Sequence, residues 1–178
     1  MSGEDASGIR ADADSETVVM RSESREDTFR LGRLLGEVAE AGDVYLLRGD
    51  FGAGKTVLVQ GLAAGLGVAT AVTSPSFVLA TEHHGRLPLY HLDLFRLERI
   101  DSDLLAGVYE YLEGDGVCAI EWPERLAVPE WLSVNEVRIE HRGEHERSIR
   151  MRPARAALAN AARRAIGTAA DGRAFERS

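Results

Sequence analysis

The sequence predicts an α/β fold built around a phosphate-binding loop. Two observations support this prediction: a G-x-x-x-x-G-K-[ST] motif occupies residues 49–56, and it stands between a short apolar run and a segment of helical character. A strand, a glycine loop and a helix in this order form the context in which such a motif binds phosphate. The 178 residues, 44% of them apolar, suffice for one well-buried core and leave little room for a second domain.

In the first half of the chain, composition and periodicity predict a tail, two strands and two helices. These are a disordered acidic tail at 1–16, a short strand at 17–23, a helix at 24–41, a buried central strand at 43–49 and a helix at 55–66. Ser24 offers an N-cap for the first helix, and Gly42 is placed to close it in a left-handed conformation. The second helix is expected to end at Gly67.

The second half is predicted to contain an antiparallel excursion, a helix, a buried strand and a terminal hairpin. The segments are two strand-like runs within 72–97 that flank a turn at Gly85–Arg86, a helix at 101–112 capped by Asp101, a strand at 116–122, a helical stretch at 125–132 broken by Pro129, a hairpin at 134–153 about Gly143, and an Ala- and Arg-rich helix at 153–166. We therefore expect three parts: the tail at 1–16, a phosphate-loop domain at 17–152, and a C-terminal helix with a frayed tail at 153–178.

Charge argues against a general nucleic-acid binder, because the chain carries a net charge of −8. The charge is uneven, however. Residues 1–27 contain eight acids and three arginines, whereas residues 138–164 contain eight arginines and three glutamates. The basic cluster is either a solvated face or a docking surface for an acidic partner or RNA.

Cysteine usage and hydropathy predict a cytoplasmic protein without a membrane partner. The single cysteine, Cys118, cannot form an intramolecular disulfide, and its apolar neighbours indicate a buried core thiol rather than a nucleophile. No apolar run approaches the length of a membrane helix. The acidic N-terminal residues also lack the order of a secretory signal.

Lysine usage singles out the glycine loop. The chain has 20 arginines and one lysine, Lys55, which stands inside the motif. A phosphate loop needs a compact ammonium on a flexible stem, and a wide planar guanidinium does not fit there. We infer that Lys55 contacts phosphate.

The loop residues are expected to hold ATP with Mg²⁺. Gly49, Gly52 and Gly54 allow successive backbone N–H groups to point at a phosphate, and the Thr56 hydroxyl is placed to ligate the metal. The candidate nucleotide-binding residues are Asp50, Phe51, Gly52, Ala53, Gly54, Lys55 and Thr56.

Catalysis also needs a carboxylate that holds the metal or orients a water, and two candidates exist. Glu121 ends a buried apolar run, as a Walker B acid does, and Asp93 lies between apolar neighbours in YHLDLFR. Either acid could instead be a strand-end charge paired with Arg96 or Arg125. His91 faces the same way as Asp93 if the segment is extended, and a structural hydrogen bond is preferred over a metal-ligand role because no zinc-site spacing exists.

Two further segments leave alternatives open. Thr73, Ser74 and Ser76 lie in TSPSF, which is either a mobile element that senses the γ-phosphate or a plain loop. Trp122 and Trp131 are either core residues or a contact surface for a partner.

Four motifs in order, GDFGAGKT, TSPSF, HLDLFRL and IEWPE, resemble the TsaE (YjeE) family, the small bacterial ATPases of tRNA threonylcarbamoyladenosine (t6A) synthesis. The resemblance covers about residues 20–150. Phe51, Ser76 and Phe95 stand where the family often has Leu, Thr and Tyr, which are mild departures.

The resemblance implies a P-loop NTPase-like three-layer sandwich with a central mixed sheet. It implies that ATP and magnesium bind, that a weak ATPase activity supports a TsaD–TsaB complex, and that tRNA is met only through that complex. In the family, threonylcarbamoyl is transferred onto an adenosine of tRNA. ATP is not consumed in that transfer, but resets or regulates the complex. Carried over to this chain, Lys55 binds phosphate, Thr56 and Glu121 hold magnesium, Asp93 supports hydrolysis, and TSPSF is the moving element.

Two other functions remain open from the residues. A small metabolite kinase could use Arg96 and Arg99, although no lid-like insertion is evident in the sequence. A nucleotide-binding regulatory module without turnover is the other alternative. Guanine specificity is not expected, because an N-K-x-D motif is absent.

Overall fold

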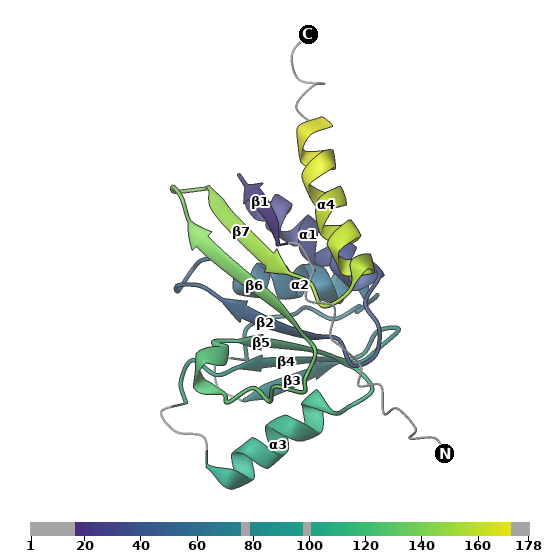
Figure 1. The fold of residues 1–178 in the computed structure, drawn as a ribbon, viewed down its shortest axis with the longest axis vertical. Helices are drawn as coiled ribbons and strands as arrows, with labels where there is room; N and C mark the ends of the chain where they lie inside the picture. Colours follow the sequence, from purple (N-terminus) through teal and green to yellow (C-terminus); the bar gives the residue numbers. More distant parts are fainter. Residues whose placement is uncertain (1–16, 76–78, 98–100, 172–178) are drawn as a thin grey trace, which may run out of the picture.

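The computed structural model describes residues 17–75, 79–97 and 101–171, in which a seven-stranded mixed sheet lies between two layers of helices (Figure 1). The strands are β1 (Val18–Ser22), β2 (Val44–Arg48), β3 (Ala80–His83), β4 (Leu89–Asp93), β5 (Val117–Glu121), β6 (Val134–His141) and β7 (Arg147–Arg152). The helices are α1 (Arg25–Glu37), α2 (Lys55–Gly65), α3 (Ser102–Leu112) and α4 (Ala156–Asp171), with a short 3₁₀ helix η1 (Pro123–Arg125).

The strand order places the glycine loop at the middle of the sheet. The order is β1-β7-β6-β2-β5-β4-β3, in which β2 runs parallel to β5 and β6, and β4 runs parallel to β5. The other pairs are antiparallel. The carboxyl ends of these four parallel strands therefore lie on the side of the loop that follows β2, which is where ligands bind in open α/β sheets.

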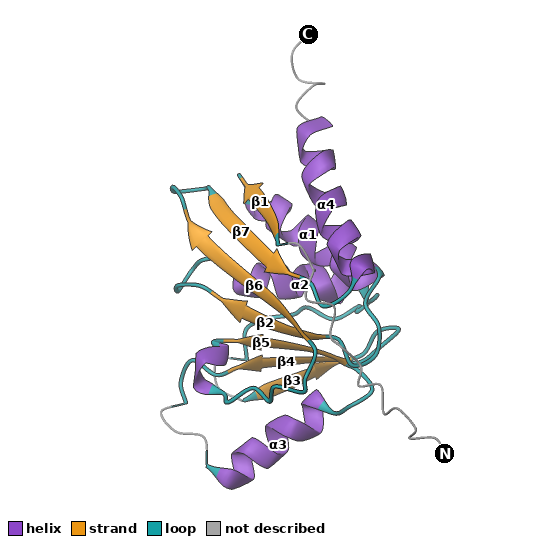
Figure 2. Cartoon of the chain, in the orientation of Figure 1, coloured by secondary structure: helices purple, strands orange, loops and turns teal. Residues whose placement is uncertain are grey.

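Two apolar clusters cover the two faces of the sheet (Figure 2). Side chains of α1, α2 and α4 pack on one face against Tyr45, Leu47 and Val137, among others. Val108 and Leu112 of α3 pack on the other face against β2, β4 and β5. The predicted three-layer α/β sandwich with a central mixed sheet is confirmed.

Helix starts follow the predicted caps. The Ser24 side chain accepts a hydrogen bond from the Asp27 N–H at 3.1 Å, and Asp101 accepts one from the Leu104 N–H at 2.9 Å. The two hairpins, β3–β4 and β6–β7, are antiparallel as expected. Residues 1–16, for which we expect a disordered tail, and the last residues of the expected frayed tail, 172–178, lie outside the described part of the chain.

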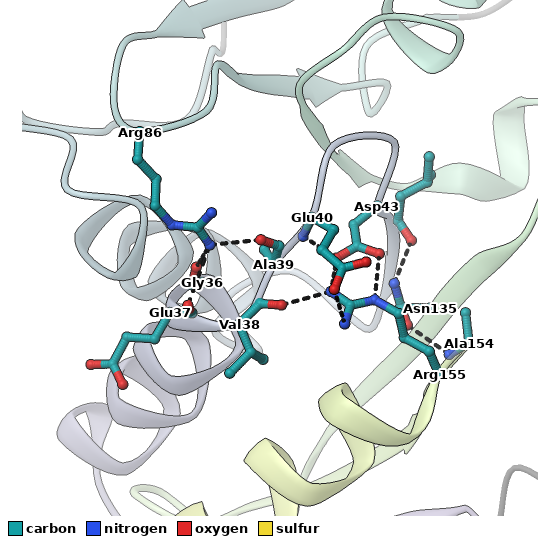
Figure 3. A network of polar contacts seen from close by, with 11 residues as sticks. Gly36, Glu37, Val38, Ala39, Glu40, Asp43, Arg86, Asn135, Ala154 and Arg155 are labelled. Atoms are coloured by element: carbon teal, nitrogen blue, oxygen red, sulfur yellow. Dashed lines mark hydrogen bonds and ion pairs between the residues drawn. The ribbon is translucent and has the colours of Figure 1, made fainter.

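The predicted end of the first helix is wrong. Helix α1 ends at Glu37, and Gly42, although its φ is +83°, lies in a later turn. Arg86, which comes from the turn before β4, donates to the carbonyl oxygens of Gly36 (2.7 Å) and Ala39 (2.6 Å) (Figure 3). A cation here satisfies the C-terminal carbonyls and opposes the helix dipole.

A second arginine holds the segment that follows α1. Arg155 donates to the Val38 carbonyl at 2.7 Å and forms an ion pair with Asp43 at 2.7 Å (Figure 3). Asn135, which is fully buried, joins the same region by donating to the Val44 carbonyl and accepting from the Ala154 N–H. These long-range contacts explain why the helix stops early.

Two other boundaries also differ from expectation. The stretch at 125–132 is not helical beyond η1, because Pro129 has no N–H to donate and the chain instead packs Leu126, Val128 and Leu132 against the α3 side of the sheet. Helix α4 starts at Ala156 and continues to Asp171, beyond the predicted end at 166.

Helices α1 and α2 approach each other closely through glycines. A Cβ added at Gly61 would lie 2.1 Å from the Phe29 carbonyl oxygen, and one at Gly32 would lie 2.2 Å from that of Leu58. Gly36 and Gly65 make the equivalent contact one turn further on. Only glycine permits this separation, and the contact holds the phosphate-loop helix against α1.

Candidate phosphate-binding site

The glycine loop runs from the end of β2 into the first turn of α2. Gly49, Gly52 and Gly54 have φ values of +144°, +74° and +111°, a backbone region that other residues rarely adopt. A Cβ on Gly49 would lie 2.3 Å from the Ile139 carbonyl oxygen, so the loop also packs directly on β6. The left-handed residues curl the loop so that backbone N–H groups at the start of α2 can bind an anion.

The Lys55 ammonium lies inside the curl of the loop. Its Nζ donates to the carbonyl oxygens of Gly49 at 2.7 Å and Asp50 at 2.9 Å, and it lies 3.9 Å from the centre of the Trp122 ring. The side chain is only 4% exposed. Burial lowers the pKa of Lys55, and the nearby carboxylates of Glu121 and Asp93 oppose this shift.

Thr56 in the first turn of α2, Glu121 at the end of β5 and His91 in the middle of β4 form a hydrogen-bonded chain. The Thr56 hydroxyl donates to Glu121 Oε1 at 2.9 Å, and His91 Nε2 lies 2.9 Å from the same oxygen. Glu121 is 3% exposed and His91 is fully buried. Because the carboxylate accepts, Nε2 carries the hydrogen, and His91 Nδ1 has no partner among the described residues. The pairing of β4 with β5 brings His91 within hydrogen-bonding distance of Glu121.

Asp93 lies next to Glu121 in the sheet but has separate partners. The two residues are opposite each other in the β4–β5 register. Asp93 Oδ2 accepts from the Ser74 hydroxyl at 2.6 Å, and Oδ1 accepts from the Phe95 N–H at 3.0 Å. The alternative for these acids is a pair with Arg96 or Arg125; among the described residues Arg125 pairs with neither, and it donates to the Leu97 carbonyl instead.

These side chains line one cavity of about 590 Å³. Its wall includes Gly52, Gly54, Lys55, Thr56, Ser74, Asp93 and Glu121, together with the aromatic side chains of Phe51, Phe95 and Trp122. The Phe95 ring lies 4.9 Å from Trp122 and 6.3 Å from Phe51, measured between ring centres. Phe51 is 82% exposed, so the aromatic group continues from the cavity onto the surface.

A second cavity of about 450 Å³ lies on the other side of the glycine loop. It is lined by the start of α1, by Gly52 to Gly54, and by the β6–β7 turn, including Thr28, Val57, His145 and Arg147. Arg147 donates to the Ala53 carbonyl at 3.2 Å and so ties this turn to the loop. The sequence contains no local signal for this cavity, because its lining comes from three distant segments.

The other candidate residues fall in three groups. Asp50 and Phe51 are exposed at the loop tip, whereas Ala53 is buried beneath it. Trp122, whose φ of +59° is the one positive value among described non-glycine residues, lines the site, whereas Trp131 is 67% exposed and away from it. Cys118 is a buried core thiol, as expected. Ser76, for which a moving element and a plain loop are the alternatives, lies outside the described residues.

The donor set fits magnesium better than a metal held by protein ligands alone. Within the described residues, no group of three or more His, Cys, Asp or Glu side chains could hold a metal ion. The Thr56 hydroxyl and the Glu121 carboxylate, 2.9 Å apart beside the glycine loop, offer the two oxygen ligands that accompany phosphate oxygens and waters around Mg²⁺.

Among the helices described, none is both long and apolar enough to cross a membrane.

Comparisons with known proteins agree on one family. A family model described as "Threonylcarbamoyl adenosine biosynthesis protein TsaE" matches residues 22–150. The chain is 42% identical to the tRNA threonylcarbamoyladenosine biosynthesis protein TsaE of Treponema pallidum over 130 residues, which cover 72% of this chain and 96% of that protein. It is 39% identical to the Bacillus subtilis protein of the same name, over 72% of this chain and 81% of the relative.

A solved structure has the same fold. The crystal structure of YdiB from Bacillus subtilis superposes with a TM-score of 0.69 at 31% sequence identity, and the match covers 84% of this chain and 94% of YdiB.

Proposed function

This chain belongs to the TsaE family, and from that premise we propose that it is a cytoplasmic ATP-binding protein of tRNA t6A synthesis with a weak, partner-dependent ATPase activity. The observation that carries the proposal is the meeting of Lys55, Thr56 and Glu121 beside a left-handed glycine loop. Membership of the family supports the assignment to tRNA t6A synthesis, and the geometry of the site supports ATP binding and hydrolysis.

ATP binding rests on the loop and its lysine. The N–H groups of residues 52–56 would bind phosphate oxygens, and the Lys55 ammonium, which donates to the carbonyls of Gly49 and Asp50 in the structure, would donate to the phosphate when ATP binds. Thr56 and Glu121 would hold Mg²⁺, which would neutralise phosphate charge when bound. His91 donates to Glu121 Oε1 and fixes the orientation of that carboxylate.

Asp93 is the residue that supports hydrolysis. One of its oxygens accepts from the Ser74 hydroxyl, and the other accepts from a backbone N–H, so the carboxylate is held at the edge of the cavity next to Glu121. From there it would accept a hydrogen bond from an attacking water and orient that water. Ser74 belongs to TSPSF, so movement of that segment would release Asp93 Oδ2.

The nucleoside of a bound ATP would lie in the second cavity. The first cavity contains Lys55, Thr56, Glu121 and Asp93, which suit the terminal phosphates, so the α-phosphate and base would lie on the opposite side of the loop. That side offers about 450 Å³, and Thr28 and His145 provide polar groups. The two cavities together accommodate one nucleotide.

The TsaD–TsaB complex is the proposed partner, and the aromatic group at the mouth of the first cavity is its contact. Phe51 is 82% and Phe95 43% exposed, which is costly for large apolar side chains in water. Exposed aromatic residues frequently anchor protein interfaces. Because these rings border the ATP site, partner binding is expected to depend on ATP, and tRNA is then met through the complex.

Phosphate release from ATP tests this function. We expect slow release by the chain alone and faster release with a TsaD–TsaB pair, and capture of that pair only when ATP is present. Lys55→Ala is the control and is expected to lose both properties. Phosphoryl transfer to a small metabolite instead of water would identify a kinase, and binding without any turnover would identify a regulatory module.

A further inference from the structure

The arginine-rich segment at 138–164 does not form one surface in the structure. Arg155 is committed to Asp43 and the Val38 carbonyl, and Arg147 donates to carbonyls of the loop and the β6–β7 turn. Arg163 and Arg164 are exposed on α4. Three others, Arg138, Arg150 and Arg152, lie on the sheet itself. The charge cluster of the sequence is therefore distributed over several unrelated places.

The three sheet arginines join a fourth from outside the segment. In the strand register Arg48 of β2 is opposite Arg138 of β6, which is opposite Arg150 of β7. Arg152 follows Arg150 by two residues and so lies on the same face. We call Arg48, Arg138, Arg150 and Arg152 the arginine face. They line a hollow of about 470 Å³ together with Thr17, Glu136 and Val137.

The two central arginines have no acidic partner among the described residues. Arg48 pairs with Glu124 at 2.9 Å, and Arg152 pairs with Glu136 at 3.4 Å, but no ion pair of this kind neutralises Arg138 or Arg150. Like charges directly opposite each other on neighbouring strands destabilise a sheet. Arg138 and Arg150 are both exposed and lie opposite each other on adjacent strands, so their guanidinium groups are placed to bind neighbouring anionic groups.

No described helix covers this part of the sheet. Val137, Ile139, Ile149 and Met151 point to the side covered by α1 and α4, so the alternating residues at 138 and 150 point to the other side. Helix α3 packs over β2, β4 and β5 and does not reach β7 or β1 (Figure 1). The arginine face is thus an open surface of the sheet.

We propose that the arginine face binds the phosphodiester backbone of RNA. Protein interfaces are built around an apolar centre, whereas nucleic-acid interfaces are more polar and more positively charged. An exposed large apolar side chain beside this face is Val19, at 56%, opposite Arg150, whereas four of the seven residues that line the hollow are arginines. The choice of RNA rests on the proposed function in tRNA modification.

The net charge of −8 determines how such a contact works. Long-range repulsion keeps the affinity of the chain for free RNA low. The arginine face therefore contributes only at short range, to RNA that is already close to the protein. Arg48 directly precedes the glycine loop, so one edge of the arginine face adjoins the ATP site. RNA held there lies beside the nucleotide-dependent part of the protein.

A matched pair of double variants tests the proposal. Arg138→Gln with Arg150→Gln removes the two unpaired charges, and Arg163→Gln with Arg164→Gln removes the same charge from α4, on the other side of the sheet. Binding of an unmodified tRNA transcript to the full chain is measured by fluorescence anisotropy at about 50 and 200 mM salt. Wild type is expected to bind weakly at both salt concentrations, with a lower affinity at about 200 mM.

The face variant is expected to lose at least about tenfold in RNA affinity and to lower the slope of log affinity against log salt by about 2, one per phosphate contact. The α4 variant should change neither quantity. Calorimetry with Mg²⁺ and ATP should give wild-type nucleotide affinity for both variants, which separates this proposal from the proposed ATPase function.

Four outcomes overturn the proposal. The first is equal loss in both variants, which would indicate a general charge effect. The second is unchanged RNA binding with loss of the TsaD–TsaB pair, which would make the face a protein interface. The third is RNA binding only after the five acids at 1–16 are neutralised, which would show that the chain's own acidic segment occupies the face. The fourth is no RNA binding by wild type under any of these conditions.

Discussion

Replacing Glu121 by Gln or by Ala separates its chemical role from its structural one. In wild type, Oε1 accepts from the Thr56 hydroxyl and from His91 Nε2, each at 2.9 Å, in a place where Glu121 is 3% and His91 0% exposed. The amide oxygen of Gln can still accept both hydrogen bonds but carries no charge for a metal. Ala removes the acceptor altogether.

The structure gives different magnitudes for the two changes. In Glu121→Ala the buried His91 N–H loses its partner, which costs about 1–3 kcal/mol, while the Thr56 hydroxyl can turn toward the cavity. For a chain of this size such a loss lowers the melting temperature by about 2–12 °C. In Glu121→Gln both hydrogen bonds persist, so the loss of stability should stay below about 1 kcal/mol. Both variants should lose about 10²-fold or more in hydrolysis rate, by analogy with the loss of one preorganised group.

Two assays measure these effects. Phosphate release at saturating ATP reports catalysis over a series of Mg²⁺ concentrations, and thermal unfolding with and without Mg²⁺–ATP reports stability and binding. We expect Glu121→Gln to melt close to the wild-type temperature and to lose Mg²⁺-dependent turnover. Wild-type turnover and Mg²⁺ dependence in Glu121→Gln would refute the metal-holding role, and equal melting of the Ala and Gln variants would refute the argument from the buried hydrogen bond.

Three other predictions use the loop, the helix contact and the core. Lys55→Arg should weaken ATP binding by about tenfold or more in calorimetry, because the ammonium is only 4% exposed within the loop and a planar guanidinium does not fit there; unchanged affinity would contradict this. Gly61→Ala should destabilise the protein by about 1–3 kcal/mol in urea unfolding, since the new Cβ would lie 2.1 Å from the Phe29 carbonyl oxygen. The control Gly107→Ala, which meets nothing within 4 Å in α3, should instead stabilise by about 0.5–1 kcal/mol, and a similar loss at both sites would show that close approach is not the cause. Burial raises the pKa of the Cys118 thiol to about 12, so iodoacetamide should label it only after unfolding. The unfolded thiol releases its proton at a lower pH than the native one, so this group also makes stability fall as pH rises from about 8.5 toward 12; labelling of the native protein at pH 8 would argue against the buried position.

The sequence alone was sufficient wherever the determining contact is local. Ser24 and Asp101 each cap a helix by accepting a hydrogen bond from the backbone N–H three residues later in the chain. These bonds form as soon as the helix does. The loop glycines and Lys55 are likewise neighbours in the chain, so their spacing predicts a phosphate-binding loop and the α/β fold around it. Glu121 was identifiable because it ends a buried strand.

Tertiary structure decided everything that depends on register and on distant side chains. Helix α1 stops at Glu37 because Arg86 and Arg155, 49 and 117 residues away from their acceptors Glu37 and Val38, take up the carbonyls there. His91 reaches Glu121 only through the β4–β5 register, and the second cavity needs three segments that are far apart in sequence. The arginine-rich segment shows the same limit, because composition counts charges, whereas strand pairing and helix packing determine which of them share a face. Short-range hydrogen bonds correspond to a periodic or fixed spacing in the sequence. A contact between distant segments has no such local pattern, so only the folded structure shows it.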